Sequence, residues 1–223
     1  DKKVILITGA SSGMGKYSAK ELIKDGYEVY GAARDVENMK ELVDLGGHAI
    51  KMDVTNDSDL KNGVNKIIEE QGKIDVLWNN AGFAQYGPLE EVSPEKAKFQ
   101  FDVNVFGLAR LTQIVLPHMR EQKSGLIINT SSMGGKIYTP LGAWYHASKH
   151  AVEGLSDCLR IELQQFGINV VVLEPGLIDT GFAAALQHHF PEETLKGPYG
   201  KIANALMKGG VDNYNGSPPS VIS

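Results

Sequence analysis

The chain has 223 residues, 42% hydrophobic and 22% charged, which is the balance of an ordinary globular protein. Its net charge of −5 excludes a globally basic surface for nucleic acid, and no apolar run approaches the ~18 residues of a membrane span. One cysteine excludes an internal disulfide, and no His/Cys set has zinc spacing. The first residues enter a strand pattern directly, unlike a signal peptide. We therefore expect a cytoplasmic protein without a metal.

Strand and helix patterns alternate along most of the chain. In chain order they predict a strand at Val4–Ile7, a helix at Met14–Asp25, a strand at Tyr27–Ala33, a helix at Val36–Leu45, a strand at His48–Met52, a helix from the cap Asn56 to Gln71, a strand at Ile74–Trp78, a helix from the cap Ser93 toward Met119, a strand at Leu126–Asn129, a helix at Trp144–Phe166 and a strand at Ile168–Leu173. Pro117 should kink or stop its helix.

Continuous apolar strands separated by helices indicate a parallel sheet that is covered on both faces. We predict an α/β fold, a three-layer doubly wound domain over residues 1–223 with a mostly or wholly parallel central sheet. The pattern weakens after Pro175, and residues 177–215 are expected to form a substrate lid. The tail from Gly216 is typical of the cap of a further helix, so we expect the natural chain to continue.

A glycine-rich turn follows the first strand, with the spacing Gly-x-x-x-Gly-x-Gly. Such a turn lets phosphates approach the backbone amides, and the following helix directs its free N–H groups at the anion. Its place between strand and helix favours dinucleotide binding over a merely structural turn. The candidate binding residues are Gly9, Ser11, Ser12, Gly13, Met14 and Gly15.

The end of the second strand bears on the choice of dinucleotide. In this fold class an acid there binds the ribose 2′-hydroxyl of NAD, whereas an arginine favours the 2′-phosphate of NADP. Arg34 stands nearest the strand end, so NADP(H) is favoured over NAD(H). If Asp35 faces the ribose instead, NAD is the cofactor. Both charges could also be simply solvated.

An acid/base pair is the most informative feature of the sequence. Tyr145 and Lys149 are four positions apart on a predicted helix, so they share one face. A phenol titrates near pH ~10, and a nearby ammonium would lower its pKa toward neutrality. Ser132 supplies a hydroxyl that can hold a substrate oxygen. Most Tyr-x-x-x-Lys pairs lie on protein surfaces without any catalytic role, so the rest of the chain must decide.

Together these residues resemble the short-chain dehydrogenase/reductase family, in its compact single-domain branch with a Rossmann fold. The resemblance runs from Val4 to about Thr180. It includes the turn Thr8–Gly15, Asp53-Val54, Asn79-Asn80-Ala81-Gly82, Asn104, Ser132, Tyr145, Lys149 and Pro175-Gly176. The family usually has one more helix and strand after the variable lid, and their absence here leaves the sheet edge undetermined.

The resemblance implies roles for further residues. Asn104 would help hold a water beside Lys149, Ser132 would be the catalytic serine rather than Ser131, and Lys149 would bind the nicotinamide ribose. The other implied cofactor-binding residues are Asp53 and Val54 at the adenine, Asn80, Ala81 and Gly82 at the adenine-side ribose, and Pro175, Gly176, Ile178 and Thr180 along the nicotinamide. Asp53 could instead be a turn acid, Asn79 and Asn80 could satisfy sheet ends, and Asn104 could be an exposed helical residue.

The implied activity is hydride transfer between a nicotinamide and a carbonyl or secondary alcohol. An apolar substrate is expected, because mostly apolar residues could line its pocket: Gly134, Tyr138, Pro140, Leu141, Phe182 and Leu186. By resemblance the protein is a homodimer or homotetramer that acts on a small molecule. The alternatives are a dinucleotide-binding sensor or scaffold without turnover and, ranked lower, an epimerase or dehydratase acting on a nucleotide sugar.

Overall fold

The computed structural model describes residues 2–176, 190–212 and 218–221. Its centre is a six-stranded sheet in the order β3-β2-β1-β4-β5-β6, and every neighbouring pair is parallel. The strands are β1 (Val4–Thr8), β2 (Glu28–Ala33), β3 (His48–Lys51), β4 (Val76–Asn79), β5 (Gly125–Thr130) and β6 (Ile168–Leu173). The predicted α/β doubly wound fold with a parallel sheet is therefore confirmed, and all six predicted strands are present to within two residues at each end.

Helices connect the strands. They are α1 (Gly13–Lys24), α2 (Lys40–Asp44), α3 (Asp57–Gln71), α4 (Pro94–Phe101), α5 (Leu108–Gln122), α6 (Ala143–Leu163), α8 (Glu192–Lys196) and α9 (Gly200–Asp212). Short 3-10 turns are η1 (Glu37–Met39), η3 (Met133–Gly135), η4 (Gln164–Phe166) and η5 (Pro219–Val221), and η2 (Asp102–Gly107) is a π-helical turn between α4 and α5. No helix of the described ranges is long and apolar enough to cross a membrane.

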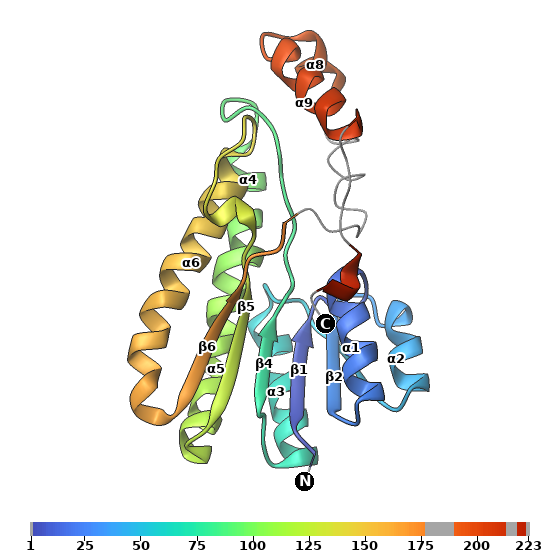
Figure 1. Cartoon of the computed structure of the whole chain (residues 1–223), viewed down its shortest axis with the longest axis vertical. Helices are drawn as coiled ribbons and strands as arrows, with labels where there is room; N and C mark the ends of the chain where they lie inside the picture. The colour runs from blue at the N-terminus through green and yellow to red at the C-terminus, as the bar shows by residue number, and fades with distance from the viewer. Residues whose placement is uncertain (1, 177–189, 213–217, 222–223) are drawn as a thin grey trace.

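The sheet is buried between two layers of apolar side chains. On one face, β-strand residues such as Leu6 and Ile127 pack against α3, α5 and the end of α6. On the other face, Ile7 and Trp78 belong to a second cluster with residues of α1, η1 and α2. Figure 1 shows the strand arrows running in one direction, with α8 and α9 beyond their carboxyl ends.

The local signals at helix starts act as expected. The side chain of Asn56 accepts a hydrogen bond from Asp59 N, Gly72 ends α3 in the left-handed conformation, and Ser93 accepts from Lys96 N just before α4. Pro117 does not stop its helix, because α5 continues to Gln122. Pro117 and Gln113, whose carbonyl loses its helical donor, are both exposed, so water can satisfy that carbonyl.

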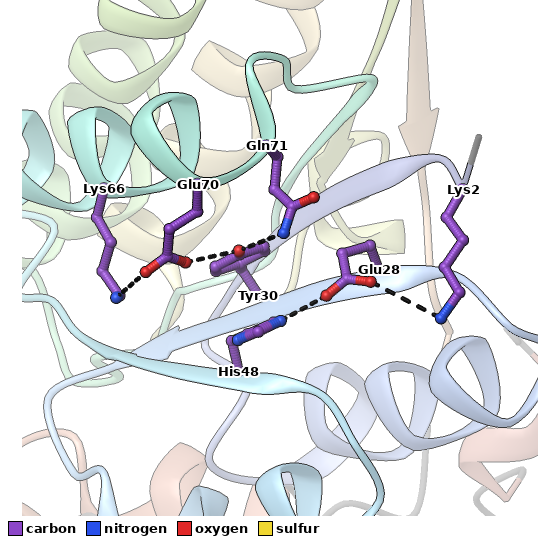
Figure 2. A network of polar contacts seen from close by, with 7 residues as sticks. All are labelled: Lys2, Glu28, Tyr30, His48, Lys66, Glu70 and Gln71. Atoms are coloured by element: carbon purple, nitrogen blue, oxygen red, sulfur yellow. Dashed lines mark hydrogen bonds and ion pairs between the residues drawn. The ribbon is translucent and has the colours of Figure 1, made fainter.

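A polar network near the amino-terminal ends of β2 and β3 links these two strands to α3, as Figure 2 shows. The Tyr30 hydroxyl donates to Glu70 Oε2 at 2.7 Å and accepts from Gln71 Nε2 at 2.9 Å, which links β2 to the end of α3. The Tyr30 ring stacks on His48 with centroids 4.2 Å apart, and His48 pairs with Glu28. This network holds the end of the sheet opposite the cleft described next.

The strand order reverses direction between β1 and β4. From β1 the chain first builds outward through β2 to β3, and it then returns to place β4 on the other side of β1. The loops that leave β1 and β4 therefore diverge at their carboxyl ends, which opens a crevice. In doubly wound sheets this is the place where ligands bind.

Candidate active site

A cleft of about 940 Å³ occupies this crevice. Its volume lies at the upper end of the usual range for ligand sites, which suits an extended ligand such as a dinucleotide. Most of the predicted site residues line it: Gly9, Ser11, Ser12, Gly13, Met14, Arg34, Asp53, Val54, Asn80, Ala81, Gly82, Ser132, Tyr145, Lys149, Pro175 and Gly176. Segments far apart in sequence thus converge on a single space.

The glycine turn is shaped by backbone that only glycine readily adopts. Gly9 has φ +66 and Gly13 has φ +56, both in the left-handed region. A Cβ on Gly15 would lie 2.5 Å from the carbonyl oxygen of Gly9, so Gly15 lets α1 start directly against the turn. Gly15 does not line the cleft and acts through this close approach. The first N–H groups of α1 lie at a wall of the cleft, where a phosphate can be bound.

The turn after β4 is held by a residue that the sequence did not single out. The buried hydroxyl of Thr8 accepts hydrogen bonds from Asn80 N and Ala81 N, both at 3.0 Å. Asn80 Nδ2 reaches back to the carbonyl of Gly9 at 3.4 Å. The only sequence signal for Thr8 was its place at the start of the glycine motif. Asn79 is structural, because its amide is buried against Thr112 and Asn129.

At the end of β2, the two candidate charges have different surroundings. The Asp35 carboxylate accepts from Glu37 N at 3.0 Å and from Asn38 Nδ2 at 2.6 Å, so it caps the turn that follows it. Arg34 is exposed on the cleft wall and forms no ion pair with any described residue. Asp53 also lines the cleft, and its pKa is lowered, against the effect of burial, by hydrogen bonds from Thr55 and by the charge of Arg34.

Asn104 lies in the π-helical turn η2 and is only 2% exposed, so the interpretation as an exposed helical residue is wrong. Its Oδ1 accepts from Phe83 N at 3.0 Å, and its Nδ2 donates to Phe83 O at 2.8 Å and to Ser148 Oγ at 3.1 Å. Asn104 does not line the cleft itself. It fixes the loop after Gly82 against α6, the helix that bears Tyr145 and Lys149.

Ser132 and Tyr145 meet at the floor of the cleft. Their side chains are hydrogen-bonded to each other, and Ser132 Oγ also accepts from Gly134 N at 3.0 Å. Tyr145 is 7% exposed and its ring packs against Tyr86, with centroids 5.7 Å apart. Ser131, the alternative partner, is buried beside Gly135 and Glu153 instead. The structure therefore brings Ser132, and not Ser131, to the phenol.

Lys149 reaches the same space from one turn along α6. Its Nζ donates to Thr130 O at 3.0 Å and lies 6.0 Å from the centroid of the Tyr145 ring. Burial lowers the pKa of Lys149 to about 8. Burial also raises the pKa of Tyr145 to about 12, although the hydrogen bond with Ser132 acts in the opposite direction. The pKa of Tyr145 is therefore raised in this structure, opposite to the expected lowering, and burial of the phenol is the main cause.

Comparison with known protein families adds to this geometry. A family model described as short chain dehydrogenase matches residues 3–190. The chain belongs to the short-chain dehydrogenase/reductase family of NAD(P)-dependent oxidoreductases.

The chain is similar to several individual proteins. The chain is 43% identical over 181 residues to a 3-ketodihydrosphingosine reductase of Bacteroides thetaiotaomicron. The matched segment is 81% of this chain and 65% of that protein. The chain thus spans just under two thirds of the length of that relative. An oxidoreductase of Botryotinia fuckeliana, BOA17, is 35% identical, with 92% of this chain and 77% of that protein covered.

Solved structures of the family have the same fold. A short-chain dehydrogenase/reductase from Burkholderia phymatum in complex with NAD superimposes with a TM-score of 0.82 at 30% identity, covering 97% of this chain and 82% of that one. A 3-ketoacyl-(acyl-carrier-protein) reductase from Brucella melitensis complexed with NADH has a TM-score of 0.78 at 34% identity, covering 81% of this chain and 77% of that one.

Some of the predicted site residues lie beyond the part of the chain that the structure describes. Ile178 and Thr180, together with the substrate-pocket candidates Phe182 and Leu186, lie outside the described residues. Within the part that is described, no group of three or more His, Cys, Asp or Glu side chains could hold a metal ion. The cleft also has an apolar wall that the sequence did not indicate, formed by Phe83, Ala84, Phe99 and Val103.

Proposed function

We propose that the protein is an NAD(P)-dependent reductase that converts a carbonyl into a secondary alcohol, with NADP(H) as the favoured cofactor. The observation that carries this proposal is the convergence of Ser132, Tyr145 and Lys149 on the same cleft as the glycine turn. That arrangement supports a role for Tyr145 as proton donor to a substrate that binds beside the nicotinamide. The bound nicotinamide supplies the hydride, and the protein supplies binding, orientation and the proton.

Tyr145 is suited to donate a proton to a carbonyl oxygen. Because its pKa is raised to about 12, the hydroxyl is protonated at neutral pH. Ser132, hydrogen-bonded to Tyr145, can hold the same substrate oxygen in place. Lys149 remains mostly cationic at pH 7 with a pKa of about 8, so a positive charge lies near the reacting groups. The protonated phenol is the form that can donate to a carbonyl oxygen in reduction.

The experiment that tests this function compares the wild type with Tyr145→Phe. Purified protein is assayed by nicotinamide absorbance against a panel of ketones and aldehydes. We expect the variant to lose roughly a hundred- to ten-thousandfold in kcat, the usual value of a positioned proton donor, while its affinity for the dinucleotide is unchanged. Ser131→Ala is a matched control, because that hydroxyl does not face Tyr145. Equal turnover in wild type and Tyr145→Phe would contradict the proposal.

The preference for NADP(H) rests on the end of β2. Asp35 already uses its carboxylate to cap the next turn, whereas Arg34 is exposed on the cleft wall. An arginine in that position suits a 2′-phosphate, and a carboxylate suits a free 2′-hydroxyl. The same assay with both cofactors tests this, and we expect kcat/KM to be higher with NADPH. A higher value with NADH, as the NAD-bound and NADH-bound relatives would suggest, would reject the preference.

We propose a hydrophobic, lipid-like ketone as the substrate. Phe190 before α8 and Ala203 of α9 pack with Tyr86 and Tyr145 in one apolar cluster, which Leu141 and Leu195 extend. This packing supports a role for α8 and α9 as part of a lid over the reacting groups. The named 3-keto lipid reductase among the relatives supports the same substrate class. Long-chain ketones in the assay panel should therefore give lower KM values than short ones.

Assembly into a homodimer or homotetramer is also proposed. Large apolar side chains are exposed on the helices around Asn104 and on α6, including Phe106 at 59% and Ile161 at 77% exposure. Exposed apolar groups of this size favour a protein interface. Sedimentation velocity of the purified chain measures the assembly state, and a monomer at micromolar concentration would contradict this proposal.

A further inference from the structure

The imidazole of His146 is buried beside the reacting groups but has no part in the proposed chemistry. His146 follows Tyr145 on α6 and is 5% exposed. Its ring meets that of Tyr145 edge-on, with centroids 5.8 Å apart. Both ring nitrogens form hydrogen bonds with residues 132–142, which we call the serine loop. This loop carries Ser132 at its start and ends where α6 begins.

Hydrogen bonds from the serine loop fix the protonation of the ring. Thr139 N lies 3.0 Å from His146 Nε2, and because a backbone N–H can only donate, Nε2 must accept. Nδ1 lies 2.8 Å from the carbonyl oxygen of Gly134, so Nδ1 must donate. Only the neutral imidazole with its proton on Nδ1 satisfies both of these contacts. With that tautomer, Nε2 also accepts from the Thr139 hydroxyl at 2.7 Å. His146 thus joins two points of the loop that are five residues apart.

One of these points leads directly to the catalytic serine. Gly134 accepts from His146 through its carbonyl, and it donates to Ser132 Oγ at 3.0 Å through its N–H. The two groups lie in successive peptide planes that meet at the Gly134 Cα, so both contacts depend on the backbone torsions of this one residue. Ser132 in turn is hydrogen-bonded to Tyr145. A continuous chain of contacts therefore runs from the imidazole through Gly134 to the hydroxyl that would hold the substrate oxygen.

The loop has glycines where the ring needs space. A Cβ on Gly134 would lie 3.1 Å from His146 Nδ1 and 3.0 Å from Tyr145 Cε1. A Cβ on Gly142 would lie 2.7 Å from His146 Cδ2, closer than any such contact can be. Neither glycine has a left-handed φ, so it is close approach rather than backbone conformation that makes them necessary. The loop is thus wrapped closely around the imidazole.

We propose that His146 is a positioning residue, which orients the Ser132 hydroxyl by holding the carbonyl of Gly134. The effect on turnover rests on the proposed function, because it needs Ser132 to hold a substrate oxygen. The geometry itself does not depend on turnover. Two consequences follow, one for kinetics and one for the proton on the ring.

The kinetic test uses two variants, each of which keeps one of the two imidazole hydrogen bonds and loses the other. His146→Asn keeps a side-chain N–H near the place of Nδ1 and loses the acceptor for Thr139. His146→Gln keeps an acceptor near the place of Nε2 and loses the donor for Gly134. We expect His146→Gln to lower kcat by roughly ten- to a hundredfold, as a misplaced catalytic group does, and His146→Asn to keep most of it. His118→Gln on α5 is the control for loss of a histidine.

A double-mutant cycle with Ser132→Ala separates positioning from a general structural effect. If His146 acts through Ser132, His146→Gln should change kcat by less than about threefold once that hydroxyl is absent. The same fold loss in both backgrounds would overturn the proposal. Measured dinucleotide affinity should stay unchanged in every variant, since none of these contacts reaches the glycine turn. If His146→Gln fails to fold, the cycle uses His146→Asn instead. This variant should lose little kcat in both the wild type and Ser132→Ala, and a large loss of kcat in either would overturn the proposal.

A spectroscopic readout is independent of turnover. Nitrogen NMR of the imidazole at pH 7 should show a neutral ring that is protonated on Nδ1, in the wild type and in Ser132→Ala alike. A ring protonated on Nε2, or on both nitrogens, would overturn the inference. Absence of turnover in the wild type would remove the proposed function, whereas the NMR result would still decide whether His146 holds the loop as described.

Discussion

Lys149 carries an ammonium group into a place from which water is largely excluded. It is 6% exposed, and its one described hydrogen-bond acceptor is the Thr130 carbonyl. Burial lowers its pKa to about 8, which means that the folded protein holds the charge at a cost. A bound dinucleotide with ribose hydroxyls would offer further acceptors. The buried ammonium of Lys149 is thus suited to binding a ligand, although its burial lowers the stability of the folded chain.

This cost predicts a particular pH dependence of stability. The folded pKa of about 8 lies below the ordinary lysine value of 10.5, so between these values the unfolded chain binds more protons and stability rises with pH. We expect the free energy of unfolding of the wild type, relative to Lys149→Met, to increase by about 2–3 kcal/mol between pH 7 and pH 10. Urea unfolding of both proteins measures it. A constant difference would show that Lys149 is not desolvated.

At the scale of the element, the continuous helix from α4 to α5 is shaped by its π-helical turn. Gly107 ends that turn with ordinary helical backbone angles, φ −63 and ψ −44. A Cβ there would lie 2.7 Å from the backbone oxygen of Val54, a residue of the cleft wall. The turn therefore packs directly against the segment expected to contact the adenine.

Gly107→Ala should destabilise the protein although alanine is the better helix former. Overpacking against rigid backbone costs about 1–3 kcal/mol, which exceeds the gain of up to about 1 kcal/mol in helix propensity. Because Val54 must move, dinucleotide affinity should also fall. Gly154→Ala in the middle of α6 is the matched control, since nothing lies within 4 Å of its Cβ, and it should stabilise. Urea unfolding and cofactor titration check both, and a stable Gly107→Ala with unchanged affinity would contradict this packing.

On the scale of the whole molecule, the two ends of the sheet have separate tasks. The carboxyl ends of the strands open into the cleft, whereas the network around Tyr30 lies near the amino-terminal ends of β2 and β3 (Figure 2). Burial raises the pKa of Tyr30 to about 12, so its hydroxyl remains a donor to Glu70 throughout the physiological range. The cleft can therefore contain a destabilising buried charge, that of Lys149, while the network at the opposite end of the strands stabilises the fold.

Tyr30→Phe tests this division. The loss of two hydrogen bonds should lower the free energy of unfolding by about 1–2 kcal/mol, because the partners Glu70 and Gln71 can still reach water. Turnover and dinucleotide affinity should not change, since the site lies at the other end of the strands. Tyr27→Phe, an exposed tyrosine at the edge of β2, should change stability by less than about 0.5 kcal/mol. A decrease in kcat of Tyr30→Phe would show that the two ends are coupled.

Much of this arrangement could be predicted from sequence because it follows from repeating patterns. Apolar runs identified all six strands, and the glycine spacing indicated the turn that lines the cleft. Features that depend on the burial of side chains could not be predicted from the sequence. The pKa of Tyr145 moved in the direction opposite to that expected, because the sequence gives the i+4 spacing but not the exclusion of water. The partners of His146 arise only when the serine loop folds back on α6.

The wide turn at Asn104 has a consequence for how this chain could change. Each residue advances an α-helix by about 100°, and the π-helical turn accommodates one residue more than an α-helical turn does, so winding the same residues as regular α-helix would rotate all that follows by about that angle. Leu111, Val115 and Met119, which are fully buried against the sheet, would then face sideways. The π-helical turn that directs Asn104 to α6 therefore also sets which side chains of α5 face the sheet, so neither can be altered without the other.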